Sequence, residues 1–223
     1  MDDAKTTLDY VKQIESTDSS FCKIGNSAET LVLSFGHIVH GGFASKTSLI
    51  NKKSENNNFD VLYMRDVEKK WYLDSLPEIG NSFSDTVNFL ESEISKYKRT
   101  IYMGSSMGGY ASILFASILT GDIVIAQTPQ TDLSYIMHDN SKAGNRARSL
   151  LKEVKKRCSK TWKLYNNLNY TINDSTYYIL GGFGPNANVL HHLHHYENIK
   201  SHSNVKRPNY FDFVKEINKH ILT

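Results

Sequence analysis

The sequence predicts an α/β protein with a mostly parallel sheet and helices on both faces. Short β-prone runs alternate with helical patterns along the chain, which is typical of parallel strands joined by helical crossovers. The 223 residues suit a single domain over 1–223. A glycine-rich turn at 104–109 separates a strand-like run from a strongly apolar helical run. These three observations predict the fold class before any single element is assigned.

The first half of the chain contributes two strands to this prediction. The run TLVLSF is β-prone and apolar and stops at Gly36, so it reads as a buried strand. The run FDVLYM follows a turn of three asparagines and has the same character. We expect helices over 3–15 and 44–53, and strands over Thr30–Phe35 and Phe59–Met64.

The middle of the chain repeats the alternation. Apolar residues at helical spacing follow Ser84, which is an N-cap candidate, and Gly121 is placed to end the next helix. We expect helices over 82–98 and 107–120, and strands over 99–103 and 122–127.

The last part holds a basic, mostly helical insertion at about 131–170, between two predicted strands. In a sheet enzyme an insertion at this place usually folds over the active end as a cap, and we expect that here. We then expect a strand over 176–180, a histidine-rich helix, a strand over 198–205 and a closing helix over 208–222.

Composition points to an ordinary globular protein, with 39% hydrophobic and 22% charged residues. No apolar run approaches the roughly 20 residues that cross a bilayer. The acidic, polar start does not fit a secretory signal, so we expect a cytoplasmic protein without a membrane span. Cys22 and Cys158 have no metal-binding spacing, and we expect plain thiols.

Positive charge is concentrated at positions 142–163, which hold nine Lys/Arg and one Glu, a local charge of +8. The rest of the chain carries 17 basic and 22 acidic residues, or −5. This segment is either a solvated helix face or an attractor of anions such as acidic polysaccharide or phosphate groups. We do not expect nucleic acid as a partner, because no recognised binding module accompanies the charge.

Residues 104–109, GSSMGG, fit G-x-S-x-G with Ser106 central, between a strand and a helix. A sharp turn at this place lifts a nucleophilic hydroxyl above the sheet, and flanking glycines avoid collisions across it. The motif in this context predicts an α/β-hydrolase fold with Ser106 as the nucleophile. The N–H of Met107 opens the following helix and is the expected first oxyanion donor.

A second oxyanion donor usually follows an early strand. Here the N–H of Gly36 or His37 comes directly after TLVLSF, and we rank both above the alternative loop His40-Gly41-Gly42.

The base and the acid complete a triad, in the chain order serine, acid, histidine. His202 stands ahead of the last predicted helix and is our choice of base, since His220 lies too late in that helix. The loop after the strand at 176–180 lacks Asp and Glu. Asp132 is therefore our choice of acid. The alternatives are Asn186 or Asn188, and another residue or no acid at all.

The run HHLHH at 191–195 places three imidazoles on one side of a helix. A metal site, a plain helix surface, and a triad or substrate role for one histidine are all open. No carboxylate or cysteine stands at ligand spacing, so we assign no metal.

Three blocks of the sequence resemble a bacterial branch of α/β-hydrolase proteins, which includes serine-triad capsular polysaccharide O-acetyltransferases and acetyltransferase-like components of accessory secretion systems. The blocks are Arg65-Asp66 with Trp71-Tyr72, GSSMGGY around Ser106, and Pro129-Gln130, within a likeness spanning about 30–135. Where that family tends to have Asp-x-x-His, this chain has Asn188-Val189-Leu190-His191.

The resemblance implies serine-dependent acyl transfer. The expected donor is acetyl-CoA, the expected acceptor an anionic polysaccharide or other glycan, and a homodimer is left open. Hydrolysis of esters and a catalytically weak accessory role are the alternatives. Trp71 and Tyr72 either stack on a sugar or belong to the core. Arg65 and Asp66 either serve the site or form a structural ion pair.

Overall fold

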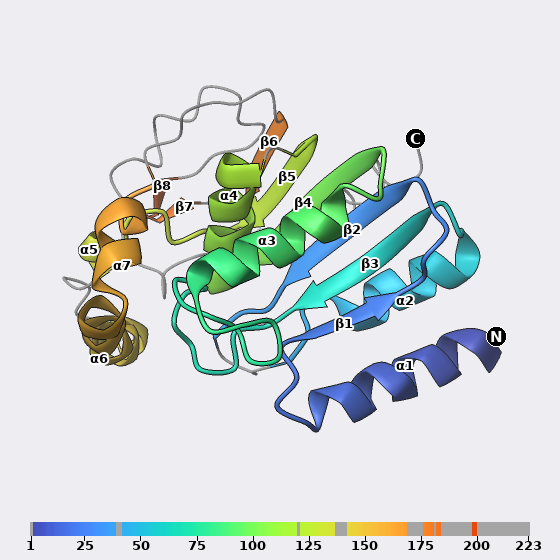
Figure 1. The fold of residues 1–223 in the computed structure, drawn as a ribbon, viewed down its shortest axis with the longest axis horizontal. Coiled ribbons are helices and arrows are strands. Elements are labelled where there is room, and N and C mark those ends of the chain that lie inside the picture. Colours follow the sequence, from blue (N-terminus) through green and yellow to red (C-terminus); the bar gives the residue numbers. More distant parts are fainter. Residues whose placement is uncertain are drawn as a thin grey trace.

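A computed structural model of the chain describes residues 2–38, 42–119, 121–136, 142–168, 176–180, 182–183 and 198–199. Its centre is a six-stranded sheet in the order β1-β3-β2-β4-β5-β6, in which all neighbours are parallel except β1 and β3 (Figure 1). The strands are β1 (Phe21–Ile24), β2 (Thr30–Phe35), β3 (Phe59–Met64), β4 (Arg99–Ser105), β5 (Ile123–Gln127) and β6 (Thr176–Leu180). The mostly parallel sheet predicted from the sequence is confirmed.

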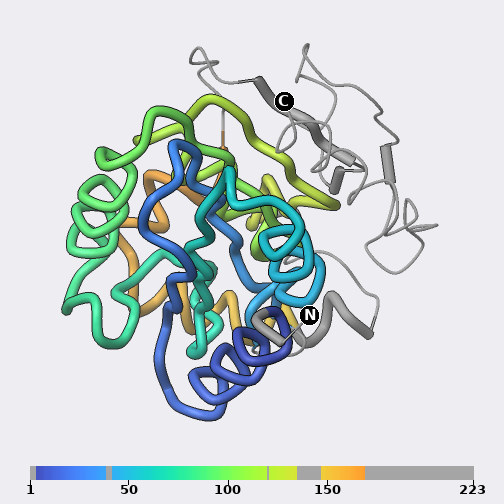
Figure 2. Tube along the Cα trace, turned by 90° about the vertical axis from the view of Figure 1, so that its right-hand side faces the viewer, coloured from blue at the N-terminus to red at the C-terminus, as the bar shows by residue number. Residues whose placement is uncertain are grey.

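Helices cover both faces of the sheet. Seen from the side in Figure 2, α3 (Phe83–Ile94) lies on one face and α2 (Lys46–Glu55) on the other. The face with α3 also carries α4 (Met107–Leu119), and α1 (Asp2–Glu15) packs beside α2. Neighbouring strand residues alternate between two buried clusters: Leu31 and Leu33 pack with α4, and Val32 packs with α2. Burial on both sides explains why these strands are continuous apolar runs.

The segment between β5 and β6 is helical, with α5 (Leu133–Ile136), α6 (Lys142–Arg157) and α7 (Ser159–Tyr165). These helices lie beyond the end of the sheet toward which the arrowheads of β2 and β3 point (Figure 1). Leu151, Trp162 and Leu168 belong to the same buried cluster as Met107 and Tyr110. The segment is thus packed on the main core; its action as a cap stays a prediction.

Two elements differ from the sequence prediction. Strand β1 was not anticipated, because it has four residues and a lysine inside it. It pairs antiparallel with β3, and the Lys23 ammonium lies 2.5 Å from the Glu93 carboxylate of α3 and 5.2 Å from the Tyr97 ring centroid.

The N-cap of α3 is Ser82, not Ser84. The Ser82 hydroxyl accepts from the Asp85 N–H at 3.2 Å, and the Asp85 carboxylate accepts from the Ser82 N–H at 2.9 Å. In this reciprocal capping box the N-cap is the residue three positions before the acid, so Asp85 makes Ser82 the N-cap.

Near the end of the chain, β7 (Gly182–Phe183) and β8 (Asn198–Ile199) form a separate parallel pair. The strand predicted over 198–205 overlaps β8, while its remainder and the helix predicted over 208–222 lie outside the described residues. No helix among the residues described has both the length and the apolar character to cross a bilayer.

Candidate active site

Ser106 stands on the turn between β4 and α4, with φ at 54°. This left-handed conformation is uncommon for a residue with a side chain. Two backbone hydrogen bonds hold it: the Ser106 N–H donates to the Gln127 carbonyl at 2.8 Å, and the Ser106 carbonyl accepts from the Tyr110 N–H at 2.9 Å. The residue is 8% exposed, so its side chain lies at the edge of the packed interior.

The glycines around Ser106 are required by close backbone contacts. A Cβ on Gly104 would lie 2.4 Å from the carbonyl of Gly108, and a Cβ on Gly108 would lie 2.2 Å from the carbonyl oxygen of Phe35. Distances this short exclude a side chain at either position. The turn can therefore form only with the spacing G-x-S-x-G, which is the geometry that a strand-to-helix nucleophile needs.

The Met107 N–H is well placed to hold an oxyanion. Met107 is the first residue of α4, and N–H groups of a first helical turn have no carbonyl acceptor within their own helix. The helix dipole adds a partial positive charge at the same point. The assignment of Met107 as an oxyanion donor stays a prediction that this geometry accommodates.

The prediction that the Gly36 N–H is the second oxyanion donor is wrong. This N–H donates to the Met64 carbonyl at 2.7 Å, which extends the β2–β3 pairing by one residue. His37 follows, is partly buried, and keeps its place as the predicted second donor. It borders an open hollow of about 460 Å³, whose other lining residues are Glu15, Gly42, Phe43, Ala44, Ser45, Lys46 and Arg65. His40 and Gly41 lie outside the described residues.

Asp132 follows β5 at the carboxyl end of the sheet and is 9% exposed. An antiparallel bridge joins it to Asn167, just after α7. Two more backbone bonds flank this bridge, from the Leu133 N–H to Asn166 at 2.8 Å and from the Leu168 N–H to Thr131 at 3.0 Å. The chain after α7 is thereby fixed to the loop after β5.

The predicted triad pairs Asp132 with His202. His202, the predicted base, lies outside the described residues, as do His220, Asn186, Asn188 and the histidines at 191–195. The roles of Asp132 and His202 therefore stay predictions. Among the residues that the structure describes, no group of three His, Cys, Asp or Glu side chains could hold a metal ion.

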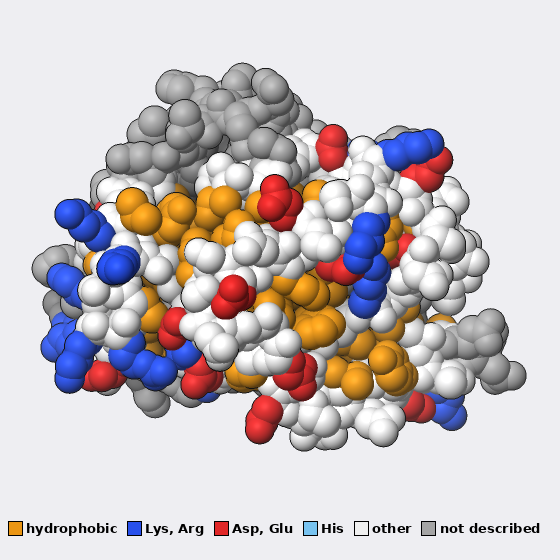
Figure 3. Space-filling view, viewed as in Figure 1, with side chains coloured by type: hydrophobic (Ala, Val, Ile, Leu, Met, Phe, Trp, Pro, Cys, Tyr) orange, Lys and Arg blue, Asp and Glu red, His pale blue; other side chains and the backbone are white. Residues whose placement is uncertain are grey.

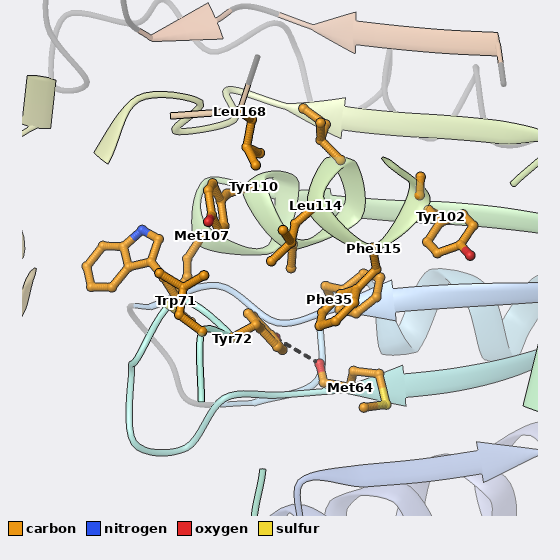
Figure 4. Close-up of a cluster of buried hydrophobic side chains, with 14 of the residues drawn as sticks. Phe35, Met64, Trp71, Tyr72, Tyr102, Met107, Tyr110, Leu114, Phe115 and Leu168 are labelled. Atoms are coloured by element: carbon orange, nitrogen blue, oxygen red, sulfur yellow. Dashed lines mark hydrogen bonds between the residues drawn. The ribbon is translucent and has the colours of Figure 1, made fainter. Parts of the chain in front are cut away.

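The prediction that Trp71 and Tyr72 stack on a sugar is wrong, because both side chains are fully buried in the core (Figure 4). The Trp71 indole N–H donates to the Gln130 side-chain oxygen at 2.8 Å. The Tyr72 hydroxyl donates to the carbonyls of Gly36, at 3.0 Å, and Met64, at 3.2 Å. Each ring packs its apolar faces in the core, and its one polar group forms a hydrogen bond, as is usual for buried tryptophan and tyrosine.

These contacts reveal a positioning role that the sequence analysis missed. Tyr72 anchors the carbonyl of Gly36, directly before His37, and its ring meets Phe35 edge-on with centroids 5.5 Å apart. Trp71 ties the same segment to the loop after β5 through Gln130. Trp71, Tyr72 and Gln130 stand in two of the sequence blocks that carry the family resemblance, and their place in those blocks was the signal available in the sequence.

Arg65 and Asp66 each bind backbone groups. Arg65 donates to the carbonyls of Glu15 and Thr17, at 2.9 and 2.6 Å, and so satisfies acceptors at the end of α1. Asp66 accepts from the Tyr72 N–H at 3.0 Å. Burial raises the pKa of the Asp66 carboxyl to about 6, and the backbone N–H groups of Tyr72 and Lys70 partly oppose that rise. Both side chains thus hold neighbouring backbone segments in place at this end of β3.

Comparisons with known proteins support the fold. No protein-family model matches the chain, and no curated protein sequence matches it. The capsule O-acetyltransferase of Neisseria meningitidis serogroup A superposes with a TM-score of 0.58 at 14% identity, over 91% of this chain and 91% of that chain. A protein of unknown function from Staphylococcus aureus Mu50 matches with a TM-score of 0.50 at 16% identity, over 91% and 93% of the two chains.

The glycosylation associate protein (Gap123) complex from Streptococcus agalactiae also matches, with a TM-score of 0.58 at 12% identity. The match covers 90% of this chain and 44% of that chain, so this chain spans less than half of it. At these identities the likeness concerns the fold alone. The sheet order, the helices on both faces and the serine on the turn after β4 together identify the chain as an α/β protein with an α/β-hydrolase fold.

Proposed function

We propose that this chain is a serine-dependent acyltransferase that moves an acetyl group from acetyl-CoA to a hydroxyl of a bacterial polysaccharide, such as a capsular one. The observation that carries the proposal is the strained turn at Ser106, with the first N–H of α4 directly after the nucleophile. The fold likeness to a capsule O-acetyltransferase supports the choice of transfer and of acceptor class.

The reaction runs in two halves. The Ser106 hydroxyl attacks the thioester carbonyl of acetyl-CoA while a histidine, predicted as His202, takes its proton. The C–S bond then breaks, the thiol leaves with that proton, and an acetyl ester remains on Ser106. A sugar hydroxyl attacks this ester and gives its proton to the same histidine. The bond between the acetyl carbon and Ser106 Oγ then breaks, Oγ takes the proton from the histidine, and the acetylated sugar and free serine result.

The groups around Ser106 support the negative charge that forms in each half. The Met107 N–H would donate to the carbonyl oxygen as it becomes an oxyanion, with the His37 N–H as the second donor. Asp132 would orient the histidine and stabilise its charged form. Tyr72, through the Gly36 carbonyl, would hold the chain that carries the second donor.

Ester hydrolysis is the second candidate, because the same turn and the same oxyanion donors serve when water replaces the sugar hydroxyl. Transfer prevails over hydrolysis only where the site excludes water and positions the sugar. The helices α5 to α7, at the carboxyl end of the strands, are the elements that would do so (Figure 1).

Intact-mass labelling tests the proposal. Wild type, Ser106→Ala and the neighbouring control Ser105→Ala would each be incubated with acetyl-CoA and, separately, with a fluorophosphonate probe. We expect one acetyl group on wild type and on Ser105→Ala, and none on Ser106→Ala. Reaction with the fluorophosphonate alone would favour the esterase. No adduct from either reagent would overturn the enzyme assignment and leave the accessory role.

A further inference from the structure

The outward sides of α6 and α7 form a concentrated cationic surface. Within 147–168, where the side chains of these helices are described, six cations are exposed and Glu153 is the one carboxylate. Figure 3 shows Lys and Arg side chains gathered at the end of the molecule that α6 and α7 occupy. The six cations, here called the α6–α7 cationic surface, are Lys152, Lys155, Lys156, Arg157, Lys160 and Lys163.

The helices hold this surface in a fixed orientation. Leu151, Val154 and Cys158 recur at helical spacing and are buried in the main core. Lys152, Lys155 and Lys156 stand at positions i, i+3 and i+4, where helical side chains are neighbours on one face. The cations therefore project from a packed support and lie close enough to repel one another.

Most of the described lysines outside α6 and α7 form an ion pair with a carboxylate. Lys53 pairs with the buried Asp60 at 3.0 Å, and Lys98 pairs with Glu29 at 2.5 Å. None of the ion pairs between described residues involves a member of the α6–α7 cationic surface. A group of like charges without matching carboxylates favours an anionic partner from outside.

The α6–α7 cationic surface is tied to the turn that carries Ser106. Tyr110, one helical turn after Ser106, donates its hydroxyl to the Tyr165 carbonyl at the end of α7, at 2.8 Å. The Asp132–Asn167 bridge joins the same end of α7 to the loop after β5. A long ligand lying on α6 and α7 would thus run along the carboxyl end of the sheet (Figure 1).

We infer that the α6–α7 cationic surface binds the acceptor and that the acceptor is a polyanion, a polysaccharide with repeating carboxylates or phosphodiesters. This inference rests on the proposed acyl transfer and names its substrate class. Single-stranded nucleic acid fits less well, because the aromatic rings here, Trp162 and Tyr165, are buried or partly buried and offer no stacking platform. A bilayer fits less well, since Leu164 is the one exposed large apolar side chain within 147–168.

Binding to a defined polymer tests the inference. The wild type would be titrated with polygalacturonate and with neutral dextran at low and at raised ionic strength. We expect binding to polygalacturonate alone, weakened by salt because screening reaches these exposed charges. Absence of binding to polygalacturonate, or tighter binding to a single-stranded oligonucleotide or to phosphatidylserine vesicles, would overturn it.

A pair of triple variants separates a local surface from overall charge. The variant Lys152→Gln, Lys155→Gln, Lys156→Gln should bind polygalacturonate about tenfold more weakly, as expected when three ionic contacts are lost. The control Lys12→Gln, Lys96→Gln, Lys98→Gln makes the same change in net charge and should stay within about twofold of wild type. Equal losses in the two variants would contradict the inference. Thermal unfolding of both checks that they fold.

Fluorophosphonate labelling of wild-type Ser106 keeps the two proposals distinguishable. A labelled Ser106 without polygalacturonate binding overturns this inference and leaves the serine nucleophile of the proposed function in place. The opposite result is an unreactive Ser106 with polygalacturonate binding that depends on the α6–α7 cationic surface. It would overturn the proposed acyl transfer and, with it, the role of the polyanion as acceptor.

Discussion

Ser106 holds a conformation that a residue with a side chain adopts only under constraint. A left-handed backbone costs such a residue about 1–2 kcal/mol, so the surroundings must impose it. The constraint here is mutual packing, because the backbone of Gly108 lies against the Phe35 carbonyl of β2. The reactive turn and the neighbouring strand therefore depend on one contact between backbones.

The substitution Gly108→Ala tests this contact. Its new methyl group would lie 2.2 Å from the Phe35 oxygen, so we expect a loss of about 3 kcal/mol in the free energy of unfolding. The control Gly109→Ala meets its nearest atom, the Gln127 oxygen, at 3.1 Å and should cost clearly less. Urea unfolding measures both, and equal losses would mean that the turn can relax.

The turn at Ser106 was predictable because its motif occupies six consecutive residues between a strand-like run and a helix-like run. The burial of Trp71 was not, since its partner Gln130 stands 59 positions away. The hydrogen bond from the Gly36 N–H to the Met64 carbonyl depends on how β2 and β3 are aligned. Apolar patterns alone do not show whether the pairing of these two strands extends to Gly36. Site geometry that depends on distant partners needed the structure.

At the scale of elements, the segment between β3 and α3 joins three parts of the molecule. Arg65 binds carbonyls at the end of α1, and the Tyr72 hydroxyl binds the end of β2. Asp66 holds the segment together internally by accepting the Tyr72 N–H. A change in the charge of Asp66 therefore reaches the surroundings of the candidate site.

The raised pKa of the Asp66 carboxyl predicts that the stability of the protein depends on pH. The pKa of its carboxyl rises from 3.8 to about 6 on burial, so between these values the folded protein keeps a proton that the unfolded chain has released. The contribution of Asp66 to the free energy of unfolding therefore decreases as pH rises through this window, by about 3 kcal/mol in all.

The variant Asp66→Asn should lose this part of the pH profile, as measured by urea unfolding at a series of pH values. Asp9→Asn is the control, because the Asp9 side chain is exposed on α1, and it should follow wild type. An unchanged profile in Asp66→Asn would show that the carboxyl titrates normally.

The strands that the sequence predicted over Thr30–Phe35, Phe59–Met64 and Thr176–Leu180 have the observed bounds. Each is an apolar or β-prone run long enough to be recognised locally. Strand β1 is shorter and forms by pairing with β3, and the N-cap of α3 moved to Ser82 because Asp85 completes a capping box there. Elements defined by a partner are the ones that sequence patterns leave uncertain.

At the scale of the whole molecule, the sheet separates two buried clusters, and each contains one cysteine. Cys22 packs with the cluster beside α1 and α2, and Cys158 with the cluster beside α4. Burial raises the pKa of both thiols to about 11, with the charges of Glu15 and Asp74 adding to the rise at Cys22 and Cys158, respectively. The two thiols thus report on the two layers separately.

We expect both thiols to react with a disulfide reagent at about pH 8 at least about a hundredfold more slowly in the native protein than in concentrated guanidinium. The raised pKa depletes the thiolate, and burial limits access. The variants Cys22→Ala and Cys158→Ala assign each rate to one layer. Native labelling of either thiol at the unfolded rate would mean that its layer opens readily.

The two layers were foreseeable because continuous apolar strands require cover on both faces. The place of α6 and α7 was not, since their contacts with Tyr110 and with the loop after β5 join residues far apart in the sequence.

Strand β1 lies at the edge of the sheet. Backbone groups on an outer strand invite a strand from another molecule, and such pairing spreads into aggregates. Lys23 interrupts β1 at its middle, and its pairing with Glu93 fixes an ammonium beside that edge. A second copy that added its strand here would have to bury the part of this ion pair that is still exposed. The residue that makes β1 hard to recognise in the sequence is thus also one that disfavours the addition of a foreign strand at this edge.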